Sequence, residues 1–329
     1  MAFEHIRGQQ AALSILRHAL DHDRLAQSYL FVGPSGVGKE LAARALAHAR
    51  LCPTRGAHPD GECEVLRRMD AGGHPDVRVF PPRDEGNRNL QVEFVRDEIL
   101  PLAKFAPFEA DAAFLIFPEA DVSFPVQHAE AANALLKTLE EPRPGVHFVL
   151  LSERPDRLLT TIRSRCQRVR FAPLPADVLD GILAQQDIPE TTRRAAVALS
   201  GGRADRALSL CIDERAERML QWALSVDGAA RERKPGTLLG LGEELARSDD
   251  RDMALESLAL FYRDVAAAAV GAVDDELAFG HRAETIRERA DSLSPAEAAA
   301  RVEDIERTQH ALERNANPEV ALDGLLFRL

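Results

Sequence analysis

Cysteine, aromatic residues and long apolar runs are all scarce in this chain of 329 residues. Its four cysteines are widely spaced and provide no disulfide framework of the kind that staples small secreted domains. The longest apolar run, from Val265 to Val273, is too short for a bilayer span, which takes about 18 residues. The first ten residues lack the apolar segment of a signal peptide. These absences predict a soluble, cytoplasmic protein that makes no contact with a membrane.

An excess of positive charge is also missing. The net charge of −12 excludes a protein that wraps nucleic acid by itself, so a contact with DNA must be local or shared with more basic partners. Positive charge is concentrated in one place, because six arginines lie between Arg154 and Arg170.

The length predicts two or three domains, at roughly 150 residues per domain.

The stretch from Ala129 to Phe171 predicts helix, strand, helix and strand in turn. Leucines at helical spacing indicate an amphipathic helix that ends at Pro142, and residues 147–151 form a short apolar run typical of a strand in a parallel sheet. A loop and a short helix then lead to Ser164, Arg165 and Cys166, and Val169 and Phe171 alternate with arginines in a further strand. This order predicts a doubly wound α/β sheet.

A phosphate-binding loop is predicted near the N-terminus. The apolar residues 29–32 indicate a strand, residues 40–51 indicate a helix, and the segment between them has the GxxxxGK spacing. Glycines let successive backbone N–H groups converge, the start of the helix adds positive potential, and the lysine reaches the outer phosphates. The candidate nucleotide-binding residues are Gly33, Pro34, Gly36, Gly38 and Lys39. The next residue is Glu40, although a Ser or Thr hydroxyl is needed there to bind Mg²⁺.

Other segments complete the expected core. A helix within residues 6–20 precedes the first strand, and an apolar stripe over residues 92–102 predicts another helix. Residues 112–117 predict a buried strand that ends at Pro118 and Glu119, with Asp121 further along. Residues 51–76 are expected to be rich in loops.

Only helical periodicity follows the linker at residues 171–175. Helices are predicted over residues 178–185 and 191–199, and a third begins after the glycine pair at 201–202. From about Ile212 onward we expect a larger all-helical region. Its last helix starts at Pro318 and is expected to bury Val320, Leu322, Leu325 and Leu326.

Cys52 and Cys63 are candidates for a metal site, but a structural zinc ion usually takes four ligands in two close pairs. These cysteines have no nearby cysteine partners, so unligated thiols in a loop are the favoured interpretation. An irregular site that also uses His58 and His74 is the alternative.

These residues together resemble the bacterial clamp-loader subunits of the AAA+ superfamily, and most closely the delta-prime family of DNA polymerase III. The matching segments are Gly8-Gln9-Gln10, the strand that enters GPSGVGK, His74-Pro75-Asp76, NALLKTLEEP at 133–142, Ser164-Arg165-Cys166, and the NANP sequence at 315–318. The resemblance covers essentially the whole chain. It implies an AAA+ core at residues 1–171, a helical lid domain at 172–211 and an all-α collar domain at 212–329.

The resemblance also implies roles for single residues. Arg165 is expected to be an arginine finger that acts in trans, flanked by Ser164 and Cys166, and Arg206 matches the sensor-2 arginine of the lid. The active ATPases of the family have Ser or Thr where Glu40 stands and Asp where Pro118 stands, next to Glu119. Their zinc module has two further cysteines where Leu66 and Met69 stand, so Cys52 and Cys63 are interpreted as its remnants and zinc is not expected.

A non-motor, or stator, subunit of the clamp loader is therefore expected, without ATPase activity of its own and with at most weak ATP binding. Its implied partners are the gamma/tau motor subunits, the delta subunit, the sliding clamp and, through the complex, primer-template DNA. The alternatives are a gamma/tau-like motor subunit that hydrolyses ATP and a nucleic-acid-binding module. The sequence has no set of carboxylates suited to two-metal nucleotidyl transfer, so DNA synthesis is not expected.

Overall fold

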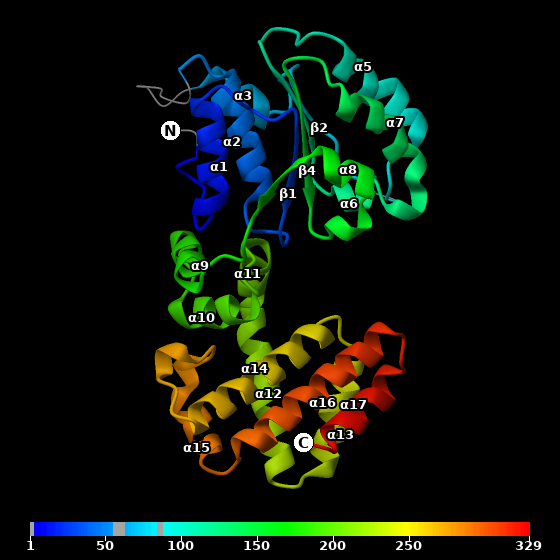
Figure 1. Cartoon of the computed structure of the whole chain (residues 1–329). Helices are drawn as coiled ribbons and strands as arrows, with labels where there is room; N and C mark the ends of the chain where they lie inside the picture. The colour runs from blue at the N-terminus through cyan, green and yellow to red at the C-terminus, as the bar shows by residue number, and fades with distance from the viewer. Residues whose placement is uncertain (1–2, 55–62, 84–87) are drawn as a thin grey trace. The chain divides into compact units, whose positions relative to one another are not determined.

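The computed structural model describes residues 3–54, 63–83 and 88–329 (Figure 1). It divides into two compact units, Met1–Pro175 and Ala176–Leu329. The division falls at the end of the proline-containing segment 171–175. Each unit is described by itself below.

A five-stranded parallel sheet forms the centre of the first unit. The strand order is β2-β3-β4-β1-β5. The strands are β1 (Ser28–Val32), β2 (Val77–Val79), β3 (Ala113–Phe117), β4 (Val146–Ser152) and β5 (Gln167–Arg170). Every residue of β3 and β4 is buried, which is the pattern expected for strands that helices cover on both faces. The doubly wound α/β core predicted from the sequence is confirmed.

Eight helices of the described residues surround this sheet. They are α1 (Gln10–Asp21), α2 (Lys39–Leu51), α3 (Glu64–Asp70), α4 (Val92–Phe94), α5 (Leu100–Lys104), α6 (Ala120–Ser123), α7 (Ala129–Glu140) and α8 (Thr160–Arg165). In Figure 1, α1, α2 and α3 cover one face of the sheet and α5, α6, α7 and α8 cover the other. A buried cluster on the second face joins Leu30, Phe117 and Phe148 of the sheet to Leu135 and Ile162 of α7 and α8.

The structure adds detail that the sequence pattern lacks. Helix α3 lies inside the segment expected to be rich in loops, and β2 is a short edge strand. The stripe at residues 92–102 is helical as predicted, but Val95–Ile99 is π-helical and joins α4 to α5. Helix α1 begins at Gln10, after a turn in which Gly8 has a positive φ of 73°.

The second unit is helical throughout its described residues. Its helices are α9 (Ala176–Leu183), α10 (Glu190–Leu199), α11 (Ala204–Cys211), α12 (Arg215–Arg231), α13 (Pro235–Ala246), α14 (Arg251–Ala269), α15 (Ala283–Ala290), α16 (Pro295–Glu313) and α17 (Pro318–Leu326). Helix α14 is central to the larger group and packs against α12, α15 and α16. A buried polar network fixes this packing, because the Asp227 carboxylate accepts hydrogen bonds from Tyr262 and Arg289.

One burial prediction in this unit is wrong. Leu322, Leu325 and Leu326 of α17 are buried as expected, but the Val320 side chain is 71% exposed. Val320 lies in the first turn of the helix, where its backbone N–H donates to the Asn317 cap and its side chain points away from the packed face. None of the helices in the described part of the chain is both long and apolar enough to cross a membrane.

Candidate functional site

The predicted phosphate loop lies at the carboxyl end of β1, between the neighbouring strands β4 and β5. Ligands of open α/β sheets bind at such a point, where successive connections leave the sheet in opposite directions. Gly38 precedes α2 with a φ of +96°, a conformation that favours glycine. Gly33 is required for space, since a Cβ atom there would lie 2.2 Å from the Phe171 carbonyl oxygen. The loop therefore has the backbone shape that its glycines predicted.

Lys39 is folded back onto its own loop. Its ammonium group donates to the carbonyl oxygens of Gly33 at 2.7 Å and Pro34 at 2.5 Å, and only 8% of the residue is exposed. A phosphate group entering the loop must therefore draw the ammonium away from these carbonyls.

Gln9 connects the phosphate loop to the segment that follows β5. Its side-chain amide donates to the carbonyl oxygens of Val37 at 3.1 Å and Ala172 at 2.7 Å, and its side-chain oxygen accepts from the Ala172 N–H. The side chain is almost completely buried. Gln9 thus holds together three segments that are distant in sequence.

Glu40 is turned toward its own helix. Its carboxylate accepts a hydrogen bond from Arg44, one turn along α2, at 2.9 Å. This ion pair compensates the negative charge that follows the lysine. A carboxylate held in this way does not reproduce the neutral hydroxyl that binds Mg²⁺ in phosphate-binding loops.

The acidic residues after β3 also have partners. Glu119 pairs with Arg88 at 3.1 Å, and both side chains are about half exposed. Asp121 is buried, and its two carboxylate oxygens accept from the backbone N–H groups of Glu153 and Arg154 at 3.3 and 3.2 Å. Asp121 therefore fixes the end of β4.

Arg165 lies at the end of α8 and is held by two groups. One terminal nitrogen of the guanidinium donates to the Thr161 carbonyl oxygen at 2.8 Å, and the other forms an ion pair with Glu140 at the end of α7. About a third of the Arg165 side chain remains exposed. A guanidinium has five N–H donors, so donors remain for a group from another molecule.

The two neighbours of Arg165 differ in their surroundings. The Ser164 hydroxyl is exposed and donates to the Thr161 carbonyl oxygen at 3.1 Å. The Cys166 thiol packs against the buried cluster beneath α7 and α8, and burial raises its pKa to about 12. Cys166 is therefore neutral at physiological pH and anchors the end of α8, while Arg165 faces outward.

The predicted lid arginine, Arg206, belongs to the second unit. It lies on α11, and its guanidinium forms an ion pair with Glu256 of α14. The role suggested for it toward a nucleotide stays a prediction.

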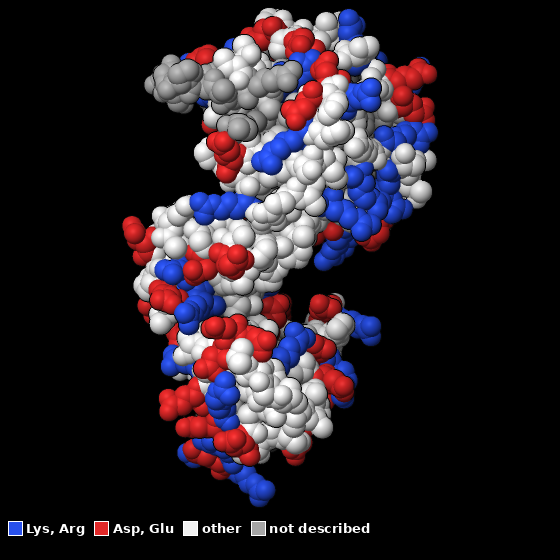
Figure 2. Space-filling view, turned by 60° about the vertical axis from the view of Figure 1, so that its left-hand side comes forward, with Lys and Arg blue, Asp and Glu red and all other residues white. Residues whose placement is uncertain are grey.

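Of the arginines between residues 154 and 170, Arg154 follows β4 and Arg170 ends β5, at the end of the sheet that carries the phosphate loop, whereas Arg165 directly precedes β5, at the opposite end. Arg168 and Arg170 are exposed on the edge strand β5 and are paired in register with Leu30 and Val32 of β1. Figure 2 shows Lys and Arg side chains gathered along one side of the first unit, although the chain as a whole is acidic.

The cysteines of the segment after α2 lie next to each other. The sulfur atoms of Cys52 and Cys63 are 3.9 Å apart, and the His48 Nε2 atom lies 3.0 Å from the Cys63 sulfur. His48 was not singled out in the sequence, although it lies four residues before Cys52 and hence on the same face of the helix. Leu66 is 39% exposed and Met69 is buried, and neither has a thiolate or imidazole to offer.

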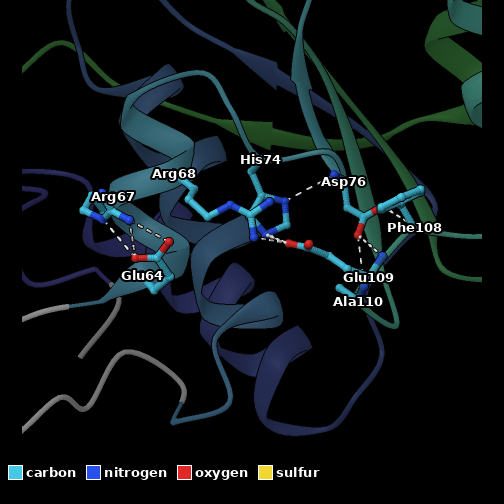
Figure 3. Close-up of polar contacts among 8 residues, drawn as sticks. All are labelled: Glu64, Arg67, Arg68, His74, Asp76, Phe108, Glu109 and Ala110. Atoms are coloured by element: carbon cyan, nitrogen blue, oxygen red, sulfur yellow. Dashed lines mark hydrogen bonds and ion pairs between the residues drawn. The ribbon is translucent and has the colours of Figure 1, made fainter.

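His74 and Asp76 belong to a different network (Figure 3). The Asp76 carboxylate accepts from three successive backbone N–H groups, those of Phe108, Glu109 and Ala110. His74 is buried, accepts from the Asp76 N–H and contacts the Glu109 carboxylate at 3.3 Å. His74 is absent from the group that His48 forms with the two cysteines, and His58 lies outside the described residues.

Comparison with known proteins places this geometry in a family. Residues 8–175 match the family model described as DNA polymerase III, delta subunit. The DNA polymerase III subunit delta' of Bacillus subtilis is 27% identical over 325 residues, which cover 98% of this chain and 96% of that protein. The subunit delta' of Pseudomonas aeruginosa is 36% identical over 59% of this chain and 57% of its own length.

A further relative is much longer than this chain. The DNA polymerase III subunit tau of Escherichia coli is 35% identical over 216 residues, which are 63% of this chain but only 32% of that protein. The match to the delta' subunit of Bacillus subtilis, by contrast, runs through both units described above. The chain therefore belongs to the DNA polymerase III delta-subunit family, as a delta-prime type of clamp-loader subunit.

Proposed function

We propose that this chain is the stator of a DNA polymerase III clamp loader and supplies Arg165 to the ATP bound by a neighbouring motor subunit. The observation that carries this proposal is the contrast between the two sites. The chain's own phosphate loop is followed by Glu40, which pairs with Arg44, and Pro118 stands at the end of β3. Arg165, however, lies at the surface with donors to spare.

The physical argument concerns the metal. Catalysis of phosphoryl transfer depends mainly on positioning and on neutralising charge with Mg²⁺ and cationic side chains. A hydroxyl after the lysine and an aspartate after β3 normally handle the metal, and this chain has neither at those positions. The chain is therefore expected to bind ATP weakly at most, through Lys39 and the loop backbone, and not to hydrolyse it.

Arg165 suits a role in trans. A guanidinium is always charged, and its planar fork matches the oxygen atoms of a phosphate. The partly buried Cys166 fixes the end of α8 from within, and the Thr161 carbonyl oxygen and Glu140 hold the arginine near the surface. In related nucleotide hydrolases an arginine finger contributes about 10³–10⁵-fold to the rate.

The clamp loader implied by this proposal has several parts. Residues 212–329 form the collar that joins the subunits, residues 172–211 form the lid, and gamma/tau and delta subunits complete the ring segment. ATP binding to the motor subunits opens or holds the sliding clamp, and hydrolysis on primer-template DNA releases it. The complex works in the cytoplasm, and this chain contacts DNA through the complex.

The test uses the reconstituted clamp loader. Arg165→Ala should leave folding and assembly intact and lower the ATPase activity that clamp and primed DNA stimulate. Arg168→Ala, a change of a nearby exposed arginine on β5, serves as the matched control and should have little effect. An ATPase activity unchanged by Arg165→Ala would refute the role in trans.

A second measurement separates the stator from a motor subunit. Calorimetry of the isolated chain with Mg-ATP should detect weak binding or none, and no turnover. Micromolar binding accompanied by turnover would instead identify a motor subunit of the gamma/tau kind.

A further inference from the structure

We propose that His18 and His22, at the C-terminal end of α1, chelate one divalent transition-metal ion through their imidazole groups. Three features of this helix end support the site: the spacing of the two histidines, the hydrogen bond that orients one of them, and the partial charge at the end of the helix. The inference is independent of the role proposed for Arg165.

The two histidines lie on the same face of α1, one turn apart. Residues four positions apart in a helix are neighbours on its surface. The ring centroids of His18 and His22 are 4.1 Å apart, and the ring planes meet at 38°. The same spacing holds zinc in the H-E-x-x-H motif, where two histidines of one helix bind the ion. Here Ala19 follows His18, so the pair offers ligands for an ion without the glutamate that acts as general base in that motif.

A hydrogen bond orients the imidazole of His22. Its Nδ1 atom lies 2.9 Å from the carbonyl oxygen of His18. A carbonyl oxygen only accepts hydrogen bonds, so Nδ1 carries the proton, and the neutral ring has its lone pair on Nε2. Metal-binding histidines almost always donate their second ring N–H to an acceptor in this way. His22 therefore has the tautomer that a metal ligand needs.

The backbone at this end of α1 is fixed by a closing turn. Asp23 has a positive φ of 52°, and its N–H donates to the Leu20 carbonyl oxygen at 3.2 Å. The Arg24 N–H donates to the Ala19 carbonyl oxygen at 2.8 Å. These two bonds form the Schellman pattern that closes many helices. The turn therefore holds the two histidines in a constant relation to each other.

The end of the helix also favours a cation. Carbonyl groups of the last turn carry a partial negative charge, so positive charge is stabilised there. His18 lies in that turn, and His22 is the C-cap residue. Both residues are exposed, which leaves room for the water molecules that complete the coordination of an ion with two protein ligands. Imidazole suits zinc, copper and nickel, so the site is expected to take an ion of this class.

The main experiment measures the binding of Ni²⁺ to the whole chain by calorimetry. His18→Gln and His22→Gln should each weaken the binding of one ion by at least about tenfold, because loss of even an outer hydrogen-bond partner of a metal ligand costs about 10–100-fold. A chelate needs both rings, so the double variant should bind little more weakly than either single variant. Ions bound elsewhere on the chain are common to all of these variants and cancel in the comparison.

His310→Gln is the matched control. The exposed His310 also places its Nδ1 atom near the carbonyl oxygen four residues earlier, at 2.8 Å. The residues four positions before and after it are Glu306 and Arg314, so it has no second imidazole one turn away. The affinity of the His310→Gln chain for Ni²⁺ should equal that of the unaltered chain.

A second measurement observes the rings themselves by NMR. Small amounts of paramagnetic Ni²⁺ should broaden the ring signals of His18 and His22 together and leave those of His310 sharp. Broadening of only one ring of the pair would overturn the proposal. Equal Ni²⁺ affinities of the His18→Gln and His310→Gln chains would also overturn it. So would losses of affinity that add up in the double variant, because they would indicate two independent histidines.

Discussion

Glu140 and Arg165 form an ion pair that joins the end of α7 to the end of α8, across 25 residues of sequence. Both residues belong to segments on which the resemblance to clamp loaders rests, NALLKTLEEP and Ser164-Arg165-Cys166. The structure thus brings two separate sequence motifs into one contact. An arginine side chain has about 2 kcal/mol of rotamer entropy. The contact with Glu140 restricts the Arg165 side chain before its guanidinium meets a phosphate.

Glu140→Ala should therefore lower the stimulated ATPase activity of the reconstituted loader by several-fold, but less than Arg165→Ala. The upper limit is about tenfold to thirtyfold, since no more than about 2 kcal/mol of side-chain entropy is at stake. The stability of the chain should change by less than about 1 kcal/mol, because the ion pair is partly exposed. Glu141→Ala, in the neighbouring exposed residue, is the control. An ATPase activity raised by Glu140→Ala would mean that Glu140 restrains the arginine rather than positions it.

A second prediction concerns Asp76, whose buried carboxylate accepts the three backbone N–H groups shown in Figure 3. Asp76→Ala leaves these donors without their acceptor, so we expect the first unit to lose about 2–4 kcal/mol of stability. For a unit of this size the thermal midpoint should fall on the order of 5–15 °C.

Glu109→Gln is the matched control, because Glu109 is partly exposed and keeps its shape in the variant. Its midpoint should stay close to that of the unaltered chain. Equal midpoints for the Asp76 and Glu109 variants would show that the three N–H groups find other acceptors.

A third prediction follows from buried histidines. Burial lowers the pKa values of His74, His147 and His281 below the ordinary value of about 6.5. At pH values between these lowered pKa values and about 6.5, the histidines are neutral in the folded chain and protonated in the unfolded chain. The folded chain therefore binds fewer protons than the unfolded chain in this pH range. Stability should therefore be fully present above about pH 6.5 and decline as the pH falls below it.

Denaturant titrations at several pH values from about 7.5 down to 5 would measure this decline. His147 is buried, stacks on Phe114 and contacts the Ala26 carbonyl oxygen through Nδ1. His147→Gln should reduce the slope of stability against pH by up to about 1.4 kcal/mol per pH unit. The exposed His310 provides a control variant, His310→Gln. A slope unaffected by His147→Gln would contradict this assignment.

Much of the core could be predicted from the sequence because its signals are local. The strand, loop and helix around Lys39 follow from an apolar run, glycine spacing and helical periodicity, and the strand order is consistent with helix–strand alternation. Strand β2 has only three residues, which is too short for a periodic pattern. The burial of Val320 was predicted wrongly because its first-turn position faces away from the packed side of α17.

The side-chain contacts of the site were not predictable in the same way. His48 and Cys63 meet because the end of α2 and the start of α3 approach each other, and Glu140 meets Arg165 because α7 packs beside α8. Such contacts depend on tertiary packing, which the local patterns of a single sequence do not predict. The spacing of four residues between His48 and Cys52 was the one local signal available.

The sharpest test of the stator compares Lys39 with Arg165. In a motor subunit the lysine of the phosphate loop is indispensable, because it neutralises the outer phosphates. In this chain the ammonium group already binds the carbonyl oxygens of Gly33 and Pro34. If the chain hydrolyses no ATP, Lys39→Met in the reconstituted loader should change its stimulated ATPase activity by less than about twofold.

Arg165→Ala should instead slow hydrolysis at the one neighbouring site that it completes, by about 10³-fold or more. The activity of the whole complex would fall by a smaller factor, because hydrolysis at sites that Arg165 does not complete would be unaffected. Rates measured with clamp and primed DNA, on complexes whose composition is verified by gel filtration, would separate the two variants. If Lys39→Met lowered the rate as much as Arg165→Ala, the chain's own loop would be a working ATPase site and the stator assignment would be wrong.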